Sequence, residues 1–206
     1  MVSLLFRFAS SFIKLQDVNL RHNSDTCLRQ QTRDVTTEEI KSEEFQNLID
    51  KMIAIMRENY GQGLAAPQVG SNLCLIVVEF ADEDYKNCIN YYGQREVEKR
   101  GMKIFPLTVL VNPTMRVVDF DKTTFEEGCL SLTATGLVER FKIVEMEALD
   151  RYGNNVQFRV DGWMARIFQH EMHHLKGLLI SDYFVQKSRS WIKSRMRRRR
   201  HWWEEI

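Results

Sequence analysis

The stretch His170-Glu171-Met172-His173-His174 decides more about this chain than any other. Histidines four residues apart lie on the same side of a helix, so His170 and His174 can bind one metal ion together. Glu171, beside the first histidine, can take a proton from a metal-activated water. The pattern is typical of metal-dependent hydrolases. An amphipathic helix that happens to carry three histidines is the alternative that the motif alone leaves open.

Two helices are predicted from their end signals and periodicity. Asp161 can cap the helix that carries the motif, and Gly177 can end it, which places this helix from 161 to about 176. Residues 37–58 are predicted to form the other helix, because apolar side chains recur there every three or four positions. Thr36 and Glu39 have the spacing of a capping box at its start.

Short apolar and β-branched runs between these helices predict strands. They lie at residues 73–78, 107–111, 115–118, 137–138, 143–149 and 156–160. The polar and charged segment 81–103 is predicted to be a surface excursion. The sequence therefore predicts an α+β fold, with mostly antiparallel sheets packed around a central metal-bearing helix.

Composition limits the class of protein. The chain has 206 residues, of which 44% are hydrophobic and 28% charged, as in one globular domain with a sizeable core. Its formal net charge of +1 predicts no DNA partner, and no apolar run is long enough to predict a membrane span. Four cysteines without C-x-x-C spacing argue against a disulfide framework and a four-cysteine zinc site.

Both ends of the chain differ from the central segment 21–186, which is predicted to be the catalytic domain. Residues 1–20 are basic, with no acidic side chain before Asp17, and predict a mitochondrial transit segment and therefore a location in the matrix. Residues 187–206 form a basic, tryptophan-containing tail that could bind ribosomal RNA. A frayed N-terminus and a solvated C-terminal tail are the alternatives.

A catalytic metal site of this kind needs a third protein ligand. Ile180 occupies the place where metzincin proteases have their third histidine, and Asp182 follows His174 too closely to lie on a second ligand-bearing helix. Upstream, Cys129 follows Gly128, which allows a tight bend to present the sulfur. Cys129 is therefore predicted to complete the site, although a lone cysteine is more often a small buried apolar residue.

Three segments resemble, in order, motifs of the peptide deformylase family. Residues 61–68 resemble G-x-G-x-A-A-x-Q, residues 127–131 match E-G-C-L-S, and residues 169–175 resemble Q-H-E-x-D-H-L. The resemblance extends from about residue 25 to 183, and the excursion with the basic N-terminus is most similar to the animal mitochondrial branch. It implies that the chain removes the N-formyl group from the initiator methionine of new polypeptides.

The resemblance also implies a role for each matching residue. It implies one divalent metal ion, with Fe(II) favoured and Zn(II), Co(II) or Ni(II) open. The metal ligands would be Cys129, His170 and His174, the general base Glu171, and the oxyanion donors the Gln68 side chain and the Leu130 backbone N–H. The residues near the peptide would be Gly63, Leu64, Ala65, Glu127, Gly128 and Arg140, the last near the peptide entrance.

The chain departs from the family pattern in three places. His173 stands where the family usually has Asp, and it is expected to lie behind the metal ligands or to be exposed. The segment 24–29 lacks two prolines, and Glu147 lies where many bacterial members have Arg. Two alternatives to the deformylase remain open: a zincin-type metalloprotease, and a catalytically weak relative that binds ribosomes through the basic tail.

Overall fold

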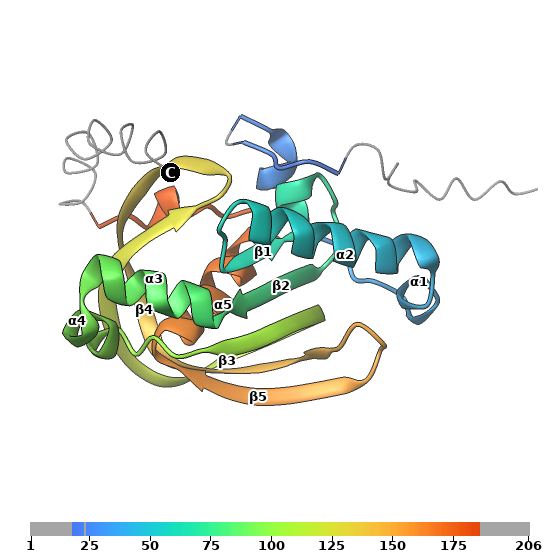
Figure 1. Ribbon diagram of the computed structural model, residues 1–206. Coiled ribbons are helices and arrows are strands. Elements are labelled where there is room, and N and C mark those ends of the chain that lie inside the picture. Colours follow the sequence, from blue (N-terminus) through green and yellow to red (C-terminus); the bar gives the residue numbers. More distant parts are fainter. Residues whose placement is uncertain (1–17, 23, 186–206) are drawn as a thin grey trace, which may run out of the picture.

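The computed structural model describes residues 18–22 and 24–185 (Figure 1). Most of the predicted transit segment, residues 1–17, lies outside these described residues, and so does the predicted tail, 187–206. Val18 belongs to the predicted transit segment, yet its side chain is only 7% exposed and packs in the core. Packed structure therefore begins before the predicted boundary at residue 20.

The described residues form one five-stranded antiparallel sheet accompanied by helices, as the predicted α+β class requires. The order in the sheet follows the order in the chain, so each strand pairs with the next. The strands are β1 (Gly63–Ala65), β2 (Leu75–Phe80), β3 (Phe105–Cys129), β4 (Leu132–Leu149) and β5 (Asn155–Asp161). β1 is consequently an edge strand, with one side unpaired within the sheet.

The hairpin of β3 and β4 is the longest feature of the fold. The pairing of β3 with β4 shifts register at four places, and such bulges bend a strand and increase its twist. In Figure 1 the far end of the hairpin curls up and around helix α5. The hairpin therefore supplies the middle of the sheet and also extends to contact α5.

Residues 107–111 and 115–118 belong to one strand and not to the two separate strands predicted, because Asn112 and Pro113 lie inside β3. Asn112 has a φ of 51°, and its side chain exchanges two hydrogen bonds with the backbone of Val35, each of 2.8 Å. The register shift between Val111 and Thr114 accommodates the proline at a position where the ladder is already irregular.

The predicted helix 37–58 is two helices, α1 (Thr37–Ile40) and α2 (Glu43–Glu58). The capping box of Thr36 and Glu39 is confirmed at the start of α1. Ser42 then caps α2 by accepting a hydrogen bond from the Phe45 N–H, and it thereby starts a new helix inside the continuous apolar pattern.

The charged excursion is helical and consists of α3 (Asp82–Tyr92) and α4 (Gln94–Lys99). Three short 3-10 helices complete the described chain: η2 (Thr26–Arg29), η3 (Ala66–Val69) and η4 (Ile180–Tyr183). No helix among the described residues is both long and apolar enough to cross a membrane.

Two apolar clusters pack on opposite faces of the sheet, because side chains alternate along β2. Leu75 and Val77 belong to the cluster that includes α2. Ile76 and Val78 belong to the cluster that includes α5 (Gly162–Leu175), the helix with the histidine motif. Asp161 precedes α5 as predicted, but its side chain makes no capping hydrogen bond.

Candidate functional site

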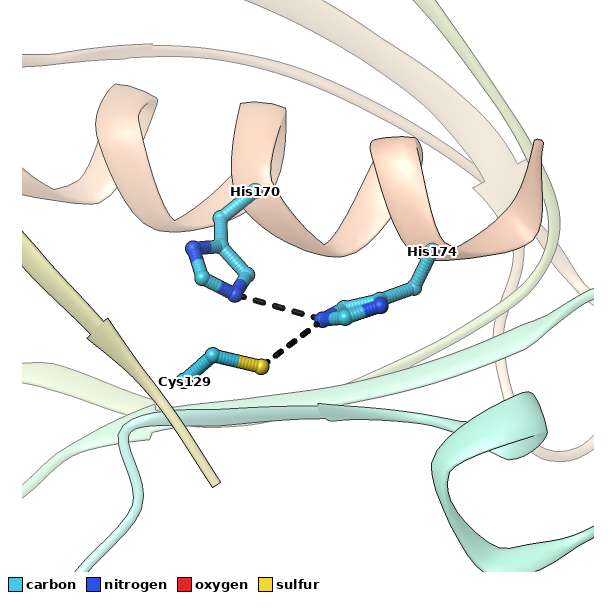
Figure 2. A group of neighbouring side chains, drawn as sticks. All are labelled: Cys129, His170 and His174. Atoms are coloured by element: carbon cyan, nitrogen blue, oxygen red, sulfur yellow. Dashed lines mark hydrogen bonds between the residues drawn. The ribbon is translucent and has the colours of Figure 1, made fainter. Parts of the chain in front are cut away.

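Helix α5 and the end of β3 bring three metal-binding atoms together (Figure 2). The Nε2 atoms of His170 and His174 are 3.3 Å apart, and the Cys129 Sγ lies 3.3 Å from the His174 Nε2. Zinc bonds of about 2.0–2.1 Å to nitrogen and 2.3 Å to sulfur place tetrahedral ligand atoms roughly 3.3–3.6 Å apart. The residues therefore fit a divalent ion held by one thiolate and two imidazoles.

Alternation along β3 directs Phe125 and Glu127 toward α5. They are two residues apart in a regularly paired stretch, so they share one face of the strand. The Arg166 side chain on α5 contacts both, the Phe125 ring at 5.2 Å and the Glu127 carboxylate at 2.8 Å. These contacts hold the end of β3 against α5, and Cys129 follows after a register shift, with its Sγ 3.3 Å from the His174 Nε2.

Glu127 is the centre of a buried charged cluster. Its Oε1 accepts from Arg140 Nε at 2.9 Å and from Arg166 Nη1 at 2.8 Å. Its Oε2 accepts from Arg140 Nη2 at 2.8 Å and faces His170 Nδ1 at 3.1 Å. Burial by itself would raise the pKa of Glu127, but the hydrogen bonds from Arg140 and His170 outweigh it and hold the pKa well below its ordinary value. Glu127 is therefore a carboxylate.

The contact with Glu127 fixes the direction of the His170 ring. A carboxylate can only accept, so His170 Nδ1–H donates to Glu127 and Nε2 points toward Cys129 and His174. Burial lowers the pKa of His170, yet the hydrogen bonds with Cys129 and Glu127 raise it to about 10. In His174, burial and the charge of His170 lower the pKa well below its ordinary value. His174 Nδ1 is buried without a hydrogen-bond partner among the described residues.

Glu171 lies in a buried position beside the candidate ligands. Its side chain is almost fully enclosed, and Oε2 has no hydrogen-bond partner within residues 18–22 and 24–185. Burial, with a smaller contribution from the charge of Glu127, raises the pKa of Glu171 to about 7. A carboxyl group with a pKa near neutrality can both accept and return a proton.

Gly63 leaves the space that Glu171 occupies. A Cβ at Gly63 would lie 2.5 Å from the Glu171 Oε1 and 2.9 Å from its Cγ, closer than side chains approach. Gly61 stands in a similar relation to Leu130, whose Cδ1 would lie 2.6 Å from an added Cβ. The G-x-G segment is therefore fitted to the residues that face it.

The Gln68 amide is oriented by two contacts. Its Oε1 accepts from the Ala65 N–H at 2.8 Å, and its Nε2 donates to the Ser131 Oγ at 3.2 Å. Nε2 also lies 3.6 Å from the Cys129 Sγ. Because Ala65 N–H fixes which end of the amide is the acceptor, the NH₂ group points toward Ser131 and the candidate ligand Cys129.

A cleft of about 850 Å³ lies in front of these groups. Its lining includes Cys129, His170, Glu171, Gln68 and Leu130, together with the aromatic side chains Tyr60, Tyr92 and Trp163. Of the residues predicted to lie near a peptide, Gly63, Glu127 and Gly128 line the cleft. Leu64 and Ala65 are fully buried and do not.

Arg140 lies in the interior, which corrects its expected place near a peptide entrance. It is 3% exposed, does not line the cleft and binds Glu127. His173 lies behind the candidate ligands, which is one of its two expected places. Its ring stacks on Tyr183 and its Nδ1 is 3.0 Å from Arg140 Nη1. Burial, followed by the charge of Arg140, lowers the pKa of His173 to about 3.

Sequence reasoning missed Arg166 and the function of Glu127 as the partner of His170. Helical spacing could have identified Arg166, because it precedes His170 by four residues and therefore lies on the same face of α5. No comparable signal connects Glu127 to His170, because they are 43 residues apart on different elements.

The fold and the site together define a class of protein. It is a candidate metallohydrolase, with an antiparallel sheet, an HExxH helix and a cysteine that faces the two histidines of that helix. The chain matches the family described as polypeptide deformylase over residues 18–190. It belongs to the peptide deformylase family.

Similar curated proteins include peptide deformylase 1A, chloroplastic/mitochondrial, of Arabidopsis thaliana, which is 40% identical over 81% of this chain and 61% of its own length. The mitochondrial peptide deformylase of Homo sapiens is 36% identical over 77% of this chain and 64% of its own length. The chain thus spans less than two thirds of the plant and human relatives. The peptide deformylase of Halothermothrix orenii is 36% identical over 82% of this chain and 94% of its own length.

Solved peptide deformylases share the fold. A structure from Synechococcus elongatus in complex with actinonin has a TM-score of 0.68 and 34% identity, with 82% of both chains covered. A Met-Ala-Ser-bound structure from Acinetobacter baumannii has a TM-score of 0.70 and 29% identity, covering 81% of this chain and 98% of the other.

Proposed function

We propose that this protein is a metal-dependent peptide deformylase, which hydrolyses the N-formyl group on the initiator methionine of newly made polypeptides. One observation carries the proposal: Cys129, His170 and His174 converge beside Glu171 and Gln68 in one cleft of a deformylase-family chain. The relative that binds Met-Ala-Ser supports a peptide beginning with methionine as the occupant of this cleft.

The metal would be held by Cys129, His170 and His174. A bound divalent cation supplies positive charge that acidifies water and polarises the formyl oxygen. One thiolate and two imidazoles suit Fe(II), Zn(II), Co(II) and Ni(II), and family membership favours Fe(II). Glu127 contributes by holding His170 in the rotamer that points Nε2 at the other two ligands.

Glu171 would act as the general base and then as the acid. It accepts a proton from the water that attacks the formyl carbon, and it returns this proton to the leaving amine nitrogen. Its raised pKa suits both steps. Formate and a free methionine amine are the products, with one water consumed.

Gln68 and Leu130 would stabilise the negative charge that grows on the formyl oxygen. The Gln68 NH₂ is already directed toward the site by Ala65, so it needs no reorientation during the reaction. The Leu130 backbone N–H would supply a second donor from the turn that follows Cys129.

The peptide would lie beside Gly63 of the edge strand β1, which lines the cleft and allows a close backbone approach, whereas Leu64 and Ala65 are buried behind it. Glu127 and Gly128 would contact it through their backbone, because the Glu127 carboxylate already binds three side chains. Tyr92 and Trp163 give the cleft an aromatic wall suited to a methionine thioether. Arg140 has no place in this arrangement as a substrate contact.

The cellular setting follows from the relatives and the chain ends. Relatives named mitochondrial or chloroplastic favour an organelle, and the basic N-terminal segment favours the mitochondrial matrix. Contact with the ribosome through residues 187–206 is part of the same proposal, and it concerns residues outside the described ones.

The test is release of formate from formyl-Met-Ala by protein purified and loaded with Fe(II) without oxygen. Glu171→Gln should lower kcat by about 10²- to 10⁴-fold while the metal content stays unchanged. Glu139→Gln, at an exposed glutamate, is the matched control and should behave as wild type. Inactivity of the wild-type protein at full metal occupancy, with each of the four metals, would exclude the proposal.

A further inference from the structure

His173 is the residue of the histidine motif that the proposed chemistry does not use, yet its ring has two defined contacts. It stacks on Tyr183 with a centroid distance of 4.1 Å and an interplanar angle of 19°. Its Nδ1 lies 3.0 Å from the Arg140 Nη1. The ring is thus held from its face and from one edge.

The contact with Arg140 determines the protonation of His173. Arginine carries only N–H donors, so Nδ1 must be the acceptor of this hydrogen bond. The ring is then neutral and carries its proton on Nε2. An imidazolium would instead direct an N–H toward a guanidinium and bring two cations together.

Arg140 connects His173 to the metal ligand His170. Arg140 Nη1 donates to His173, whereas Nε and Nη2 donate to the two oxygens of Glu127 at 2.9 and 2.8 Å. Glu127 accepts in turn from His170 Nδ1 at 3.1 Å. Because a guanidinium is planar and rigid, an acceptor at Nη1 also fixes the directions of Nε and Nη2.

Tyr183 is itself fixed to the sheet, so it can hold the His173 ring in place. The next residue, Phe184, forms a β-bridge with Val138 of β4, and its ring fills the space over Gly136. The preceding residue, Asp182, forms an ion pair with Arg29. The segment 182–184 therefore lies across β4 with its tyrosine against His173.

We propose that His173 is a positioning residue for the metal ligand His170, acting through Arg140 and Glu127. The inference rests on the metal centre of the proposed function. Because the His173 ring is neutral, Glu127 is the carboxylate that pairs with the Arg140 cation. An acidic residue at position 173 would form a second ion pair with Arg140 and compete with Glu127 for it. The imidazole also stacks on Tyr183, which a carboxylate side chain cannot do.

The test compares three substitutions of His173 by the rate at which Zn(II)-loaded protein loses its metal to an excess of chelator. Asn places a carbonyl oxygen where Nδ1 lies, Gln places it one bond further, and Ala has no acceptor. His173→Ala and His173→Gln should lose metal up to about 10-fold faster, less than the roughly 10- to 100-fold effect of removing a ligand's direct outer partner, because His173 acts through two further residues. His173→Asn should remain close to wild type, as should the exposed control His22→Asn.

Equal rates for the Asn and Gln variants, or a wild-type rate for a folded Ala variant, would overturn the proposal. Where the Ala variant fails to fold, the Asn and Gln pair, compared at matched thermal stability, decides. Nitrogen NMR of the Zn(II)-loaded wild-type protein gives an independent answer: a neutral His173 ring protonated at Nε2 is required, and an imidazolium or an Nδ1–H form contradicts it.

Tyr183→Leu removes the stacking partner but keeps the acceptor. It should accelerate metal loss less than His173→Ala does, and Tyr152→Leu, at a tyrosine 72% exposed, should have no effect. An unchanged rate in Tyr183→Leu would remove Tyr183 from the proposal. None of these measurements uses a formylated substrate. If the protein holds metal as described but releases no formate, the proposed function is wrong and the role of His173 still stands.

Discussion

The β3 wall of the cleft is held by buried charges, whereas the wall formed by β1 and η3 is held by neutral contacts. On the β3 side, Glu127 binds Arg140, Arg166 and His170 in the interior. On the other side, the Gln68 amide bonds to a backbone N–H and a hydroxyl, and Gly63 leaves space for Glu171. Both walls face the same cleft.

This difference indicates that the two walls contribute differently to the stability of the fold and to the rate of the reaction. A buried charge that loses its partner is costly to the folded state, so the β3 wall should govern folding and metal retention. A displaced neutral donor costs the fold less but leaves the developing oxyanion without support, so the β1–η3 wall should govern the rate.

Removing the central charge of the β3 wall should have the largest effect. Glu127→Gln should lower the free energy of unfolding by about 3–5 kcal/mol, because two buried guanidiniums lose their carboxylate. Urea unfolding of the metal-free protein measures it. Glu39→Gln, which breaks an exposed ion pair, is the matched control and should cost less than about 1 kcal/mol. Equal losses in the two variants would contradict the distinction between a buried and an exposed pair.

Gln68→Ala tests the neutral wall. It should lower kcat by about 10²- to 10³-fold, as removal of an oxyanion donor does. The cost in unfolding free energy should be smaller, about 1–3 kcal/mol, for the buried Ala65 N–H that loses its acceptor. Steady-state kinetics with formyl-Met-Ala separates the effect on kcat from the effect on KM. A rise in KM with unchanged kcat would assign Gln68 to substrate binding alone.

Gly63→Ala should act on the same wall by displacing Glu171. A shift of the base by about 1 Å can lower kcat by up to roughly 10²-fold, with the metal content unchanged. Gly61→Ala is the comparison: its added Cβ meets the end of the Leu130 side chain, which can rotate away, so its loss should be smaller. The reverse ranking would show that Leu130 and not Glu171 is the sensitive neighbour.

The smallest effect is expected at Glu39, outside both walls. The hydrogen bond from Arg33 lowers the pKa of Glu39 to about 2 from an ordinary value of 4.5. Its contribution to stability is therefore present above pH 4.5 and is lost as pH falls toward 2. Glu39→Gln should remove this part of the pH dependence of urea unfolding, worth less than about 1 kcal/mol because solvent reaches both exposed side chains and screens the pair.

The sequence could predict features that depend on local spacing. The Thr36 and Glu39 capping box, the extent of α5 and the antiparallel strands follow from periodicity and turn residues. The break between α1 and α2 was hidden, because Ser42 interrupts the backbone without interrupting the apolar pattern. The continuity of β3 through Pro113 was also hidden, since it depends on the long-range bond from Asn112 to Val35.

The same limit applies to the site. His170, His174 and Glu171 share a short motif, and a requirement for a third ligand led to Cys129. The exclusive use of Arg140 in the interior could not be predicted, because its partners Glu127 and His173 lie 13 and 33 residues away in sequence. Charge alone does not distinguish an arginine at a surface from one enclosed with a carboxylate.

The bulges of β3 impose a rule of parity on mutation by insertion. From Lys122 to Glu127 the pairing with β4 is regular, so Phe125 and Glu127 lie an even step apart and share a face; the next register shift lies between Glu127 and Cys129. A single inserted codon between 123 and 126 would turn Glu127, the partner of His170, to the opposite face, whereas two inserted codons would restore its direction. Natural length variation within this run should therefore occur in pairs of residues, or else at the bulges outside it.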